Sequence, residues 1–343
     1  MELALNKRSA CMVLRDLRSR DAFDPRSQER IDLPIPDPGP DRSRWSKKLL
    51  REELPGIVLG ANCRISVASP LNSERICVAG VENTLYGQGL PPKSFVRISP
   101  EIAISSPELL FLEMASVMTP VIQALLGYEL CGGFSRDPLS PRDGDVTHFI
   151  RPASSVSRLR AFLDQSRNVR GLGQSERVLG WVKDNAWSAR EAIIGMLMAM
   201  PASESGYGFS DIILNDRIGV GPDATRVPDI TIGRTGVHVN YDGEVHLSDR
   251  ERYVDDRRRD RELAARGETV LVVTKEDLNQ QGGLDRVMWL ALDAIERRGF
   301  GLMEDVRATL VDKDAAMRRQ QLIWSLMPGE RGRQLSRQLA EGW

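Results

Sequence analysis

The sequence of 343 residues lacks a long hydrophobic run and an excess of charge of either sign. No stretch reaches the roughly 18 uninterrupted apolar residues that a membrane span needs. Charged residues also interrupt the first twenty positions, so no secretory signal is expected. The expected protein is therefore cytoplasmic and not bound to a membrane. Its length admits two or three domains of roughly 100–200 residues each.

Clustered cysteines are also missing, because the four that occur stand far apart without a C-x-x-C pair: Cys11, Cys63, Cys77 and Cys131. This spacing favours separate thiols in a reducing compartment over a zinc site. Lysine and arginine total 47 against 48 aspartates and glutamates. Any surface that binds nucleic acid must therefore be local.

Changes of composition along the chain predict four segments. Residues 1–55 are expected to form a helical segment with a proline-rich linker, and residues 56–135 a small α+β domain. A polar loop then leads to an α/β domain over residues 148–310, and residues 311–343 are expected to form a C-terminal helix and tail.

Local patterns predict the elements of the N-terminal half. Apolar residues at helical spacing indicate a helix over 10–17, and short β-like runs occupy 63–67, 75–78 and 95–98. The run that starts Ser-Pro-Glu predicts a helix over 106–121, because it offers a cap, a proline at the first turn and an early acid.

The most informative segment is RVPDITIGRTGVHVNYDGEVH, residues 226–246. Two β runs, Val227–Ile232 and Val237–Asp242, flank a Gly-Arg-Thr-Gly turn, which predicts a hairpin that pairs Ile232 with Val237 and Asp229 with Asn240. Side chains alternate along a strand, so one face is apolar. The other face carries polar groups, which form either a ligand row or an ordinary solvated surface: Asp229, Thr231, His238, Asn240 and Asp242.

The elements around the hairpin predict a crossover. Ser248-x-x-Glu251 reads as a capping box that opens a helix ending near Gly267. The β-branched run Thr269–Thr274 suits a buried strand, parallel to one strand of the hairpin. Upstream, residues 188–200 predict a helix with Glu191 in its first turn.

This order of elements resembles the very-short-patch-repair-like branch of the PD-(D/E)XK nuclease superfamily. The resemblance covers about residues 185–280 and depends on three ordered motifs: Val227-Pro228-Asp229, Asp242-Gly243-Glu244-Val245-His246, and a charged helix with Asp256, Arg259, Asp260, Leu263 and Gly267. It implies a restriction-endonuclease-like α-β-β-β-α-β core within an α/β chain, preceded by an α+β region. It also implies metal-dependent cleavage of DNA.

The resemblance further implies the site residues. They are the catalytic group Glu191, Asp229, Asp242 and His246, with Mg²⁺ or Mn²⁺ held by Asp229, Asp242 and Asn240. One departure is Asn240, which stands where the family has glutamate, so an alternative is an inactive nuclease fold that binds DNA as a regulator or antitoxin. His246 has a second interpretation, as a structural histidine at a strand end.

Two further features of the sequence predict binding partners. The run Arg257-Arg258-Arg259 is a candidate DNA contact, or alternatively a solvated face paired with neighbouring aspartates. Residues 105–115 (SSPELLFLEMA) resemble a segment of abortive-infection-type antitoxins. That likeness implies a defence or regulatory context and a protein partner, whereas the oligomeric state stays open.

Overall fold

The computed structural model describes residues 3–34, 64–77, 79–87, 89–140, 146–221, 224–242, 258, 261–301 and 303–327. The chain divides into two compact units, with the boundary between Leu179 and Gly180. Both units mix helices with strands, which confirms the predicted α/β class. Within the described part of the chain, no helix combines the length and the apolar character that a membrane crossing needs.

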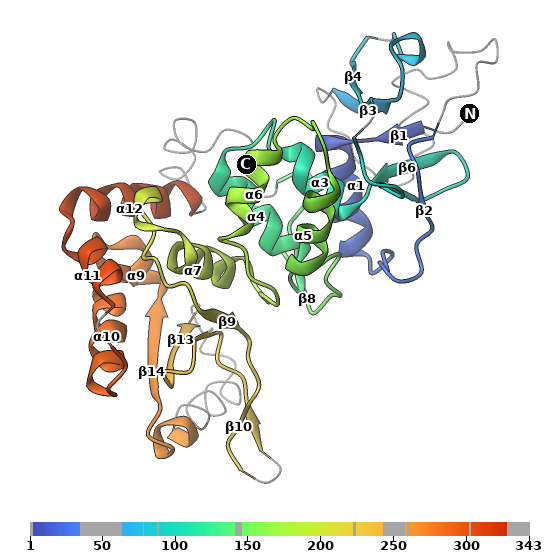
Figure 1. The fold of residues 1–343 in the computed structure, drawn as a ribbon. Helices are drawn as coiled ribbons and strands as arrows, with labels where there is room; N and C mark the ends of the chain where they lie inside the picture. Colours follow the sequence, from blue (N-terminus) through green and yellow to red (C-terminus); the bar gives the residue numbers. More distant parts are fainter. Residues whose placement is uncertain are drawn as a thin grey trace. The chain divides into compact units, whose positions relative to one another are not determined.

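The described part of the N-terminal unit contains a mixed sheet of six short strands (Figure 1). The strands are β1 (Leu3–Leu5), β2 (Arg30–Ile31), β3 (Ile65–Ser69), β4 (Val81–Leu85), β5 (Phe95–Arg97) and β6 (Ile102–Ser105). They lie in the order β2-β5-β6-β1-β3-β4, and β1 pairs parallel with β6 and antiparallel with β3. All three residues of β1 are buried, so this tripeptide belongs to the core of the sheet.

Strand β5 confirms the run predicted over 95–98, whereas the strand predicted over 75–78 is wrong where it is described. The Asn83 side chain explains the difference. It accepts a hydrogen bond from the backbone N–H of Ile76 (2.8 Å) and donates one to the Ile76 carbonyl (3.0 Å). The backbone of Ile76 is thus satisfied by a side chain rather than by a strand ladder, and the paired strand is β4, which follows it.

Helices pack against this sheet and against one another. Helix α1 (Lys7–Ser19) confirms the predicted N-terminal helix and contacts β3 and β6. Helix α3 (Pro107–Met114) begins after Ser106, whose side chain accepts from the Leu109 N–H. The single helix predicted over 106–121 is wrong, because a second helix, α4 (Pro120–Leu130), starts at a proline that cannot continue the first. Every residue of α3 is buried, so it has no exposed face.

The predicted boundary between domains also differs from the structure. Helices α5 (Val156–Gln165) and α6 (Leu172–Leu179) fall in the range 148–310, but they belong to the N-terminal unit. They pack on α3 and α4 and bury Leu159, Phe162 and Val178. The expected polar loop before them contains a small ribbon of β7 (Phe134–Ser135) and β8 (Thr147–His148).

The C-terminal unit has a sheet with the order β14-β13-β12-β9. Its elements are, in chain order, α7 (Ala189–Ala199), β9 (Ile212–Leu214), a ribbon of β10 (Ile218–Gly219) and β11 (Thr225–Arg226), β12 (Ile230–Ile232), β13 (Val237–Asp242), β14 (Thr269–Thr274), α9 (Lys275–Asn279), α10 (Gly283–Arg297), α11 (Glu304–Val311) and α12 (Lys313–Leu326). Helix α10 lies along β14 in Figure 1 and contacts β13 as well.

The predicted hairpin is confirmed, and so is the parallel strand predicted after it. Ile232 pairs with Val237 in an antiparallel ladder, and β14 pairs parallel with β13 along its full length. Gly233 and Gly236 in the turn have φ angles of 46° and 66°, which explains why glycine occupies both ends of the turn. Strand β12 begins at Ile230, later than predicted. The capping box at Ser248 lies outside the described residues, although Leu263 before the crossover strand is fully buried.

Candidate functional site

The candidate site lies where β12 begins and β13 ends. Asn240 Oδ1 accepts a hydrogen bond from the backbone N–H of Asp229 (3.0 Å), and Asp229 Oδ2 accepts one from the backbone N–H of Tyr241 (2.6 Å). Each of the two side chains therefore accepts a hydrogen bond from the backbone of the opposite strand. This exchange fixes both side chains at one end of the hairpin and agrees with the register predicted for Asp229 and Asn240.

Glu191 reaches the same region through an intermediate residue. It lies in the first turn of α7, after Ser188, whose hydroxyl caps the helix by accepting from the Glu191 N–H (3.2 Å). The Glu191 carboxylate accepts from the Trp187 N–H (2.9 Å) and from Asn215 Nδ2 (2.7 Å). The backbone N–H of Asn215 in turn donates to the Asp229 carbonyl (2.9 Å). Glu191 thus supports the Asp229 backbone by way of Asn215.

Asn215 was not among the predicted site residues. It follows β9 with a φ angle of 50°, a left-handed conformation that asparagine tolerates better than most residues do. The sequence Leu-Asn-Asp after an apolar run was a signal for such a turn. Nothing in that signal showed that the amide side chain would contact Glu191.

Three residues of the polar face of the hairpin, Thr231, His238 and Asn240, are buried rather than solvated. His238 is 1% exposed, its Nδ1 lies 3.0 Å from Thr231 Oγ1, and its Nε2 lies 2.9 Å from Glu268 Oε2. Burial lowers the pKa of His238, and this effect outweighs the carboxylate of Glu268, which acts to raise it. A neutral imidazole then accepts from the Thr231 hydroxyl and donates to Glu268. Thr231 is itself 5% exposed, so this group is structural.

Asp242 completes the described part of the site. It is the last residue of β13, half-buried, two residues beyond Asn240 and paired with Thr274 of β14. By alternation it shares a sheet face with Asn240 and Asp229. Diagonal neighbours across strands lie about 7–8 Å apart, which lets two carboxylates approach a common ion. Among the described residues, no group of three or more histidines, cysteines or acids is arranged to hold a metal.

The donor set therefore has two carboxylates and one amide oxygen. Mg²⁺ usually takes one or two protein carboxylates and keeps water in its remaining positions, so Asp229 and Asp242 suit it. The Glu191 carboxylate already accepts hydrogen bonds from Trp187 and Asn215, so it is not counted in this donor set. His246 lies outside the described residues and stays a prediction.

The predicted arginine run is described at one position only. Arg257 and Arg259 lie outside the described residues. The Nε of Arg258 lies 3.9 Å from Glu262, and the Arg258 side chain is 57% exposed. Glu262 also pairs with Arg226 at 2.5 Å. This contact favours the self-paired interpretation at Arg258 while leaving its guanidinium accessible.

A cavity of 530 Å³ lies along β9, next to this site. Asn185 and Asn215 line it, together with two cations, Lys183 and Arg217, and two acids, Asp184 and Asp216. Asn185 Nδ2 donates to the Leu214 carbonyl (3.2 Å), and Asn215 Nδ2 donates to the Asn185 carbonyl (2.8 Å). These bonds join the cavity wall at Asn185 to Asn215, the residue that supports the backbone of Asp229.

Comparison with known proteins adds no relative: no family model, no curated protein and no solved structure matches the chain. The function must therefore be inferred from the residues of the site and their geometry.

Proposed function

We propose that the C-terminal unit is a restriction-endonuclease-like domain that acts on DNA. One observation carries this proposal. The antiparallel strands β9, β12 and β13 are followed by β14 parallel to β13, and the register brings Asp229, Asn240 and Asp242 to one end of this sheet. This strand order agrees with the α-β-β-β-α-β core that the resemblance implies, and it supports the proposal.

The chemistry assigned to the site is hydrolysis of a phosphodiester. Asp229 and Asp242 would hold Mg²⁺ or Mn²⁺, which, when bound, activates water and stabilises the charge that develops on phosphate. Glu191 is a positioning residue, because it acts through Asn215 on the backbone of Asp229.

A second function, DNA binding without cleavage, is favoured by Asn240. The residue brings no charge to a dication, and its Oδ1 already accepts from the Asp229 N–H. Such a domain would serve in a regulator or antitoxin-like protein, in keeping with the likeness of residues 105–115. The two functions share the fold and differ in the number of carboxylates at the site.

Substitution at Asn240 separates the two functions in the full chain. Asn240→Glu adds a carboxylate opposite Asp229, so affinity for Mn²⁺ should rise in calorimetric titration, and plasmid nicking should appear or increase. Nicking should respond to Mn²⁺ before Mg²⁺, since magnesium demands stricter octahedral geometry. If neither the parent protein nor this variant binds Mn²⁺ at millimolar concentration, cleavage is rejected and DNA binding is retained.

Asp229→Asn tests the metal ligand in the parent protein. Asparagine can still accept from the Tyr241 N–H, so the fold should survive while nicking falls about 100-fold or more. Asp293→Asn is the matched control, because Asp293 is exposed on α10 and pairs with Arg297. Full activity in the Asp229→Asn protein would place cleavage elsewhere or in a contaminant.

A further inference from the structure

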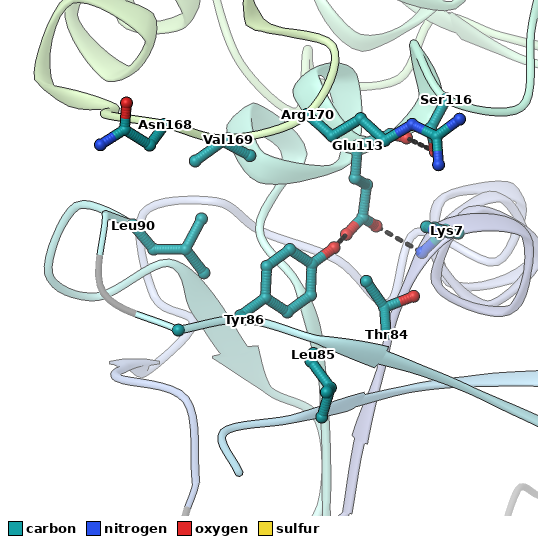
Figure 2. Close-up of a pocket in the computed structure, with 11 residues that line it drawn as sticks. Lys7, Thr84, Leu85, Tyr86, Leu90, Glu113, Ser116, Asn168, Val169 and Arg170 are labelled. Carbon is teal, nitrogen blue, oxygen red and sulfur yellow. Dashed lines mark hydrogen bonds between the residues drawn. The ribbon is translucent and has the colours of Figure 1, made fainter. Parts of the chain in front are cut away.

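The N-terminal unit contains a cavity of 290 Å³ that is independent of the site proposed above (Figure 2). Four parts of the unit line it: the start of α1, the end of β4 with the loop after it, the end of α3, and the loop before α6. Ligand cavities run from roughly 300 Å³ upward, so this one is at the lower limit of size and suits only a small ligand. Its wall contains both charged and apolar side chains.

Glu113 is the buried acid of this cavity. Its side chain accepts hydrogen bonds from the Tyr86 hydroxyl (2.5 Å) and from the backbone N–H of Lys7 at the start of α1, as Figure 2 shows. Burial raises the pKa of Glu113 to about 7, although these two donors, Ser105 and the Lys7 charge all act to lower it. The carboxyl group therefore changes charge near neutral pH.

Other titratable groups face Glu113 without supplying negative charge at that pH. Burial raises the pKa of the Cys11 thiol on α1 to about 11, and burial also raises the pKa of Tyr86 well above its usual value. Lys7 and Arg170 line the cavity as cations. When Glu113 is protonated, the charge of the lining is positive.

The remaining wall mixes apolar side chains with the polar residues Thr84, Ser116 and Asn168, and glycine-containing loops hold part of it. Leu85, Leu90 and Val169 line it, and the Gly89 carbonyl accepts from the Arg167 N–H (3.0 Å), which joins two of the loops. Gly89 has a φ angle of 129°, and an added Cβ would lie 2.1 Å from the Arg167 carbonyl oxygen. The loops therefore meet closely, and the cavity is formed before any ligand arrives.

We propose that this cavity binds a small organic anion, with a carboxylate or phosphate held by Lys7 and Arg170 and an apolar body against Leu90 and Val169. Binding is favoured by the neutral form of Glu113, because an ionised carboxylate at the same wall repels the ligand. Ligand uptake near pH 7 is therefore coupled to proton uptake. The site lies within the N-terminal unit and does not depend on nuclease chemistry elsewhere.

Three probes with one apolar body test the charge of the ligand: phenylacetate, phenyl phosphate and 2-phenylethylamine. Isothermal titration of the full chain should give saturable 1:1 binding of one or both anions and none of the amine. The tighter anion identifies the head group. Phenylacetate stays ionised between pH 6 and pH 8, so a fall in its affinity over this range of about fivefold or more reports on the protein. Titration in two buffers of different ionisation enthalpy should show proton uptake.

Variants assign these effects to residues. Glu113→Gln keeps an acceptor for the Lys7 N–H and should abolish both the pH dependence and the proton uptake. Arg170→Ala should weaken anion binding about tenfold, whereas Arg160→Ala, an exposed arginine on α5, should not. An added Cβ at Gly87 would meet no atom within 4 Å. Gly87→Leu should therefore fold normally and block the cavity by volume alone.

The proposal fails if the amine binds as tightly as the anions or if no anion binds at millimolar concentration. It also fails if phenylacetate binding is unchanged in Gly87→Leu, since the ligand would then lie elsewhere. Thermal unfolding of each variant shows that loss of binding is not loss of fold.

Discussion

The site in the C-terminal unit and the cavity in the N-terminal unit both contain buried or half-buried acids, but these acids face different surroundings. At the hairpin, the oxygens of Glu191 and Asp229 accept from neighbouring N–H groups of the chain. In the cavity, Glu113 accepts from Tyr86 and Lys7 and also borders open space. A sequence motif marks the first site, whereas the second is assembled from distant residues. Burial of an acid therefore marks a candidate site only together with the space beside it.

A third buried acid, Glu129, sharpens this comparison within one unit. Its carboxylate accepts three hydrogen bonds from the Arg15 guanidinium, of 2.9, 3.2 and 2.8 Å, and another from the Arg136 N–H (3.0 Å). Burial acts to raise the pKa of Glu129, but the charges and hydrogen bonds of Arg15 and Arg136 together outweigh it and lower the pKa to about 2. Glu113 has no such arginine among the causes of its shift, and its pKa moves the opposite way.

The largest expected effect is on the stability of the N-terminal unit in Glu129→Gln. This change leaves the Arg15 charge buried and uncompensated, which costs about 3–5 kcal/mol of unfolding free energy. Denaturant unfolding followed by hydrogen exchange in α4 measures the loss. Glu113→Gln at pH 7 is the control and should lose little. Equal losses in both variants would remove the distinction between the two acids.

A smaller effect is expected from the proton on Glu113. The folded state holds this proton more tightly than the unfolded chain does, so the stabilisation is complete below pH 4.5 and is lost as pH rises through about 7. The loss should reach about 3 kcal/mol by pH 8. Glu113→Gln should therefore be more stable than the parent at pH 8 and similar to it at pH 5. Hydrogen exchange of α3 at both pH values is the measurement.

A third, smaller effect is expected at the hairpin. Thr231→Val removes the hydroxyl that donates to His238 Nδ1. It should lower the free energy of unfolding by about 1–2 kcal/mol, because a buried acceptor is left without its partner.

The lowered pKa of His238 makes the stability of the C-terminal unit depend on pH. Stability of the C-terminal unit should be full above pH 6.5 and decline as pH falls below that value. A flat pH profile in His238→Gln would assign the decline to this ring.

Local patterns predicted the hairpin of β12 and β13 well. Its turn glycines, alternating side chains and final β-branched strand are all encoded within 50 residues, and the register follows from the turn. Strands β1 and β4 were missed. Leu3–Leu5 is too short to show a period, and Val81–Leu85 is mostly half-exposed with polar residues. Both depend on partners elsewhere in the sheet for their extended form.

For the site, too, only the part that depends on the local pattern of the hairpin was predictable. Asp229 and Asn240 came together because one turn sets their register, whereas Asn215 and Glu268 joined the site through tertiary contacts. Nothing local indicated the cavity around Glu113, because Lys7, Tyr86 and Arg170 are brought together by three separate segments. Their chemistry follows from packing, which periodicity does not report.

The position of β1 within its sheet has a consequence for synthesis. Leu3 pairs with Ile102 of β6. Since β1 precedes the other strands of this sheet along the chain, about one hundred further residues must be synthesised before that partner exists. At roughly 5–20 residues per second, the delay is about 5–20 s. Until β3, its antiparallel partner, is made about 65 residues later, the apolar tripeptide is available to chaperones or to other nascent chains. Closing this sheet also requires a long loop, so the N-terminal unit should be slower to fold than the hairpin of β12 and β13.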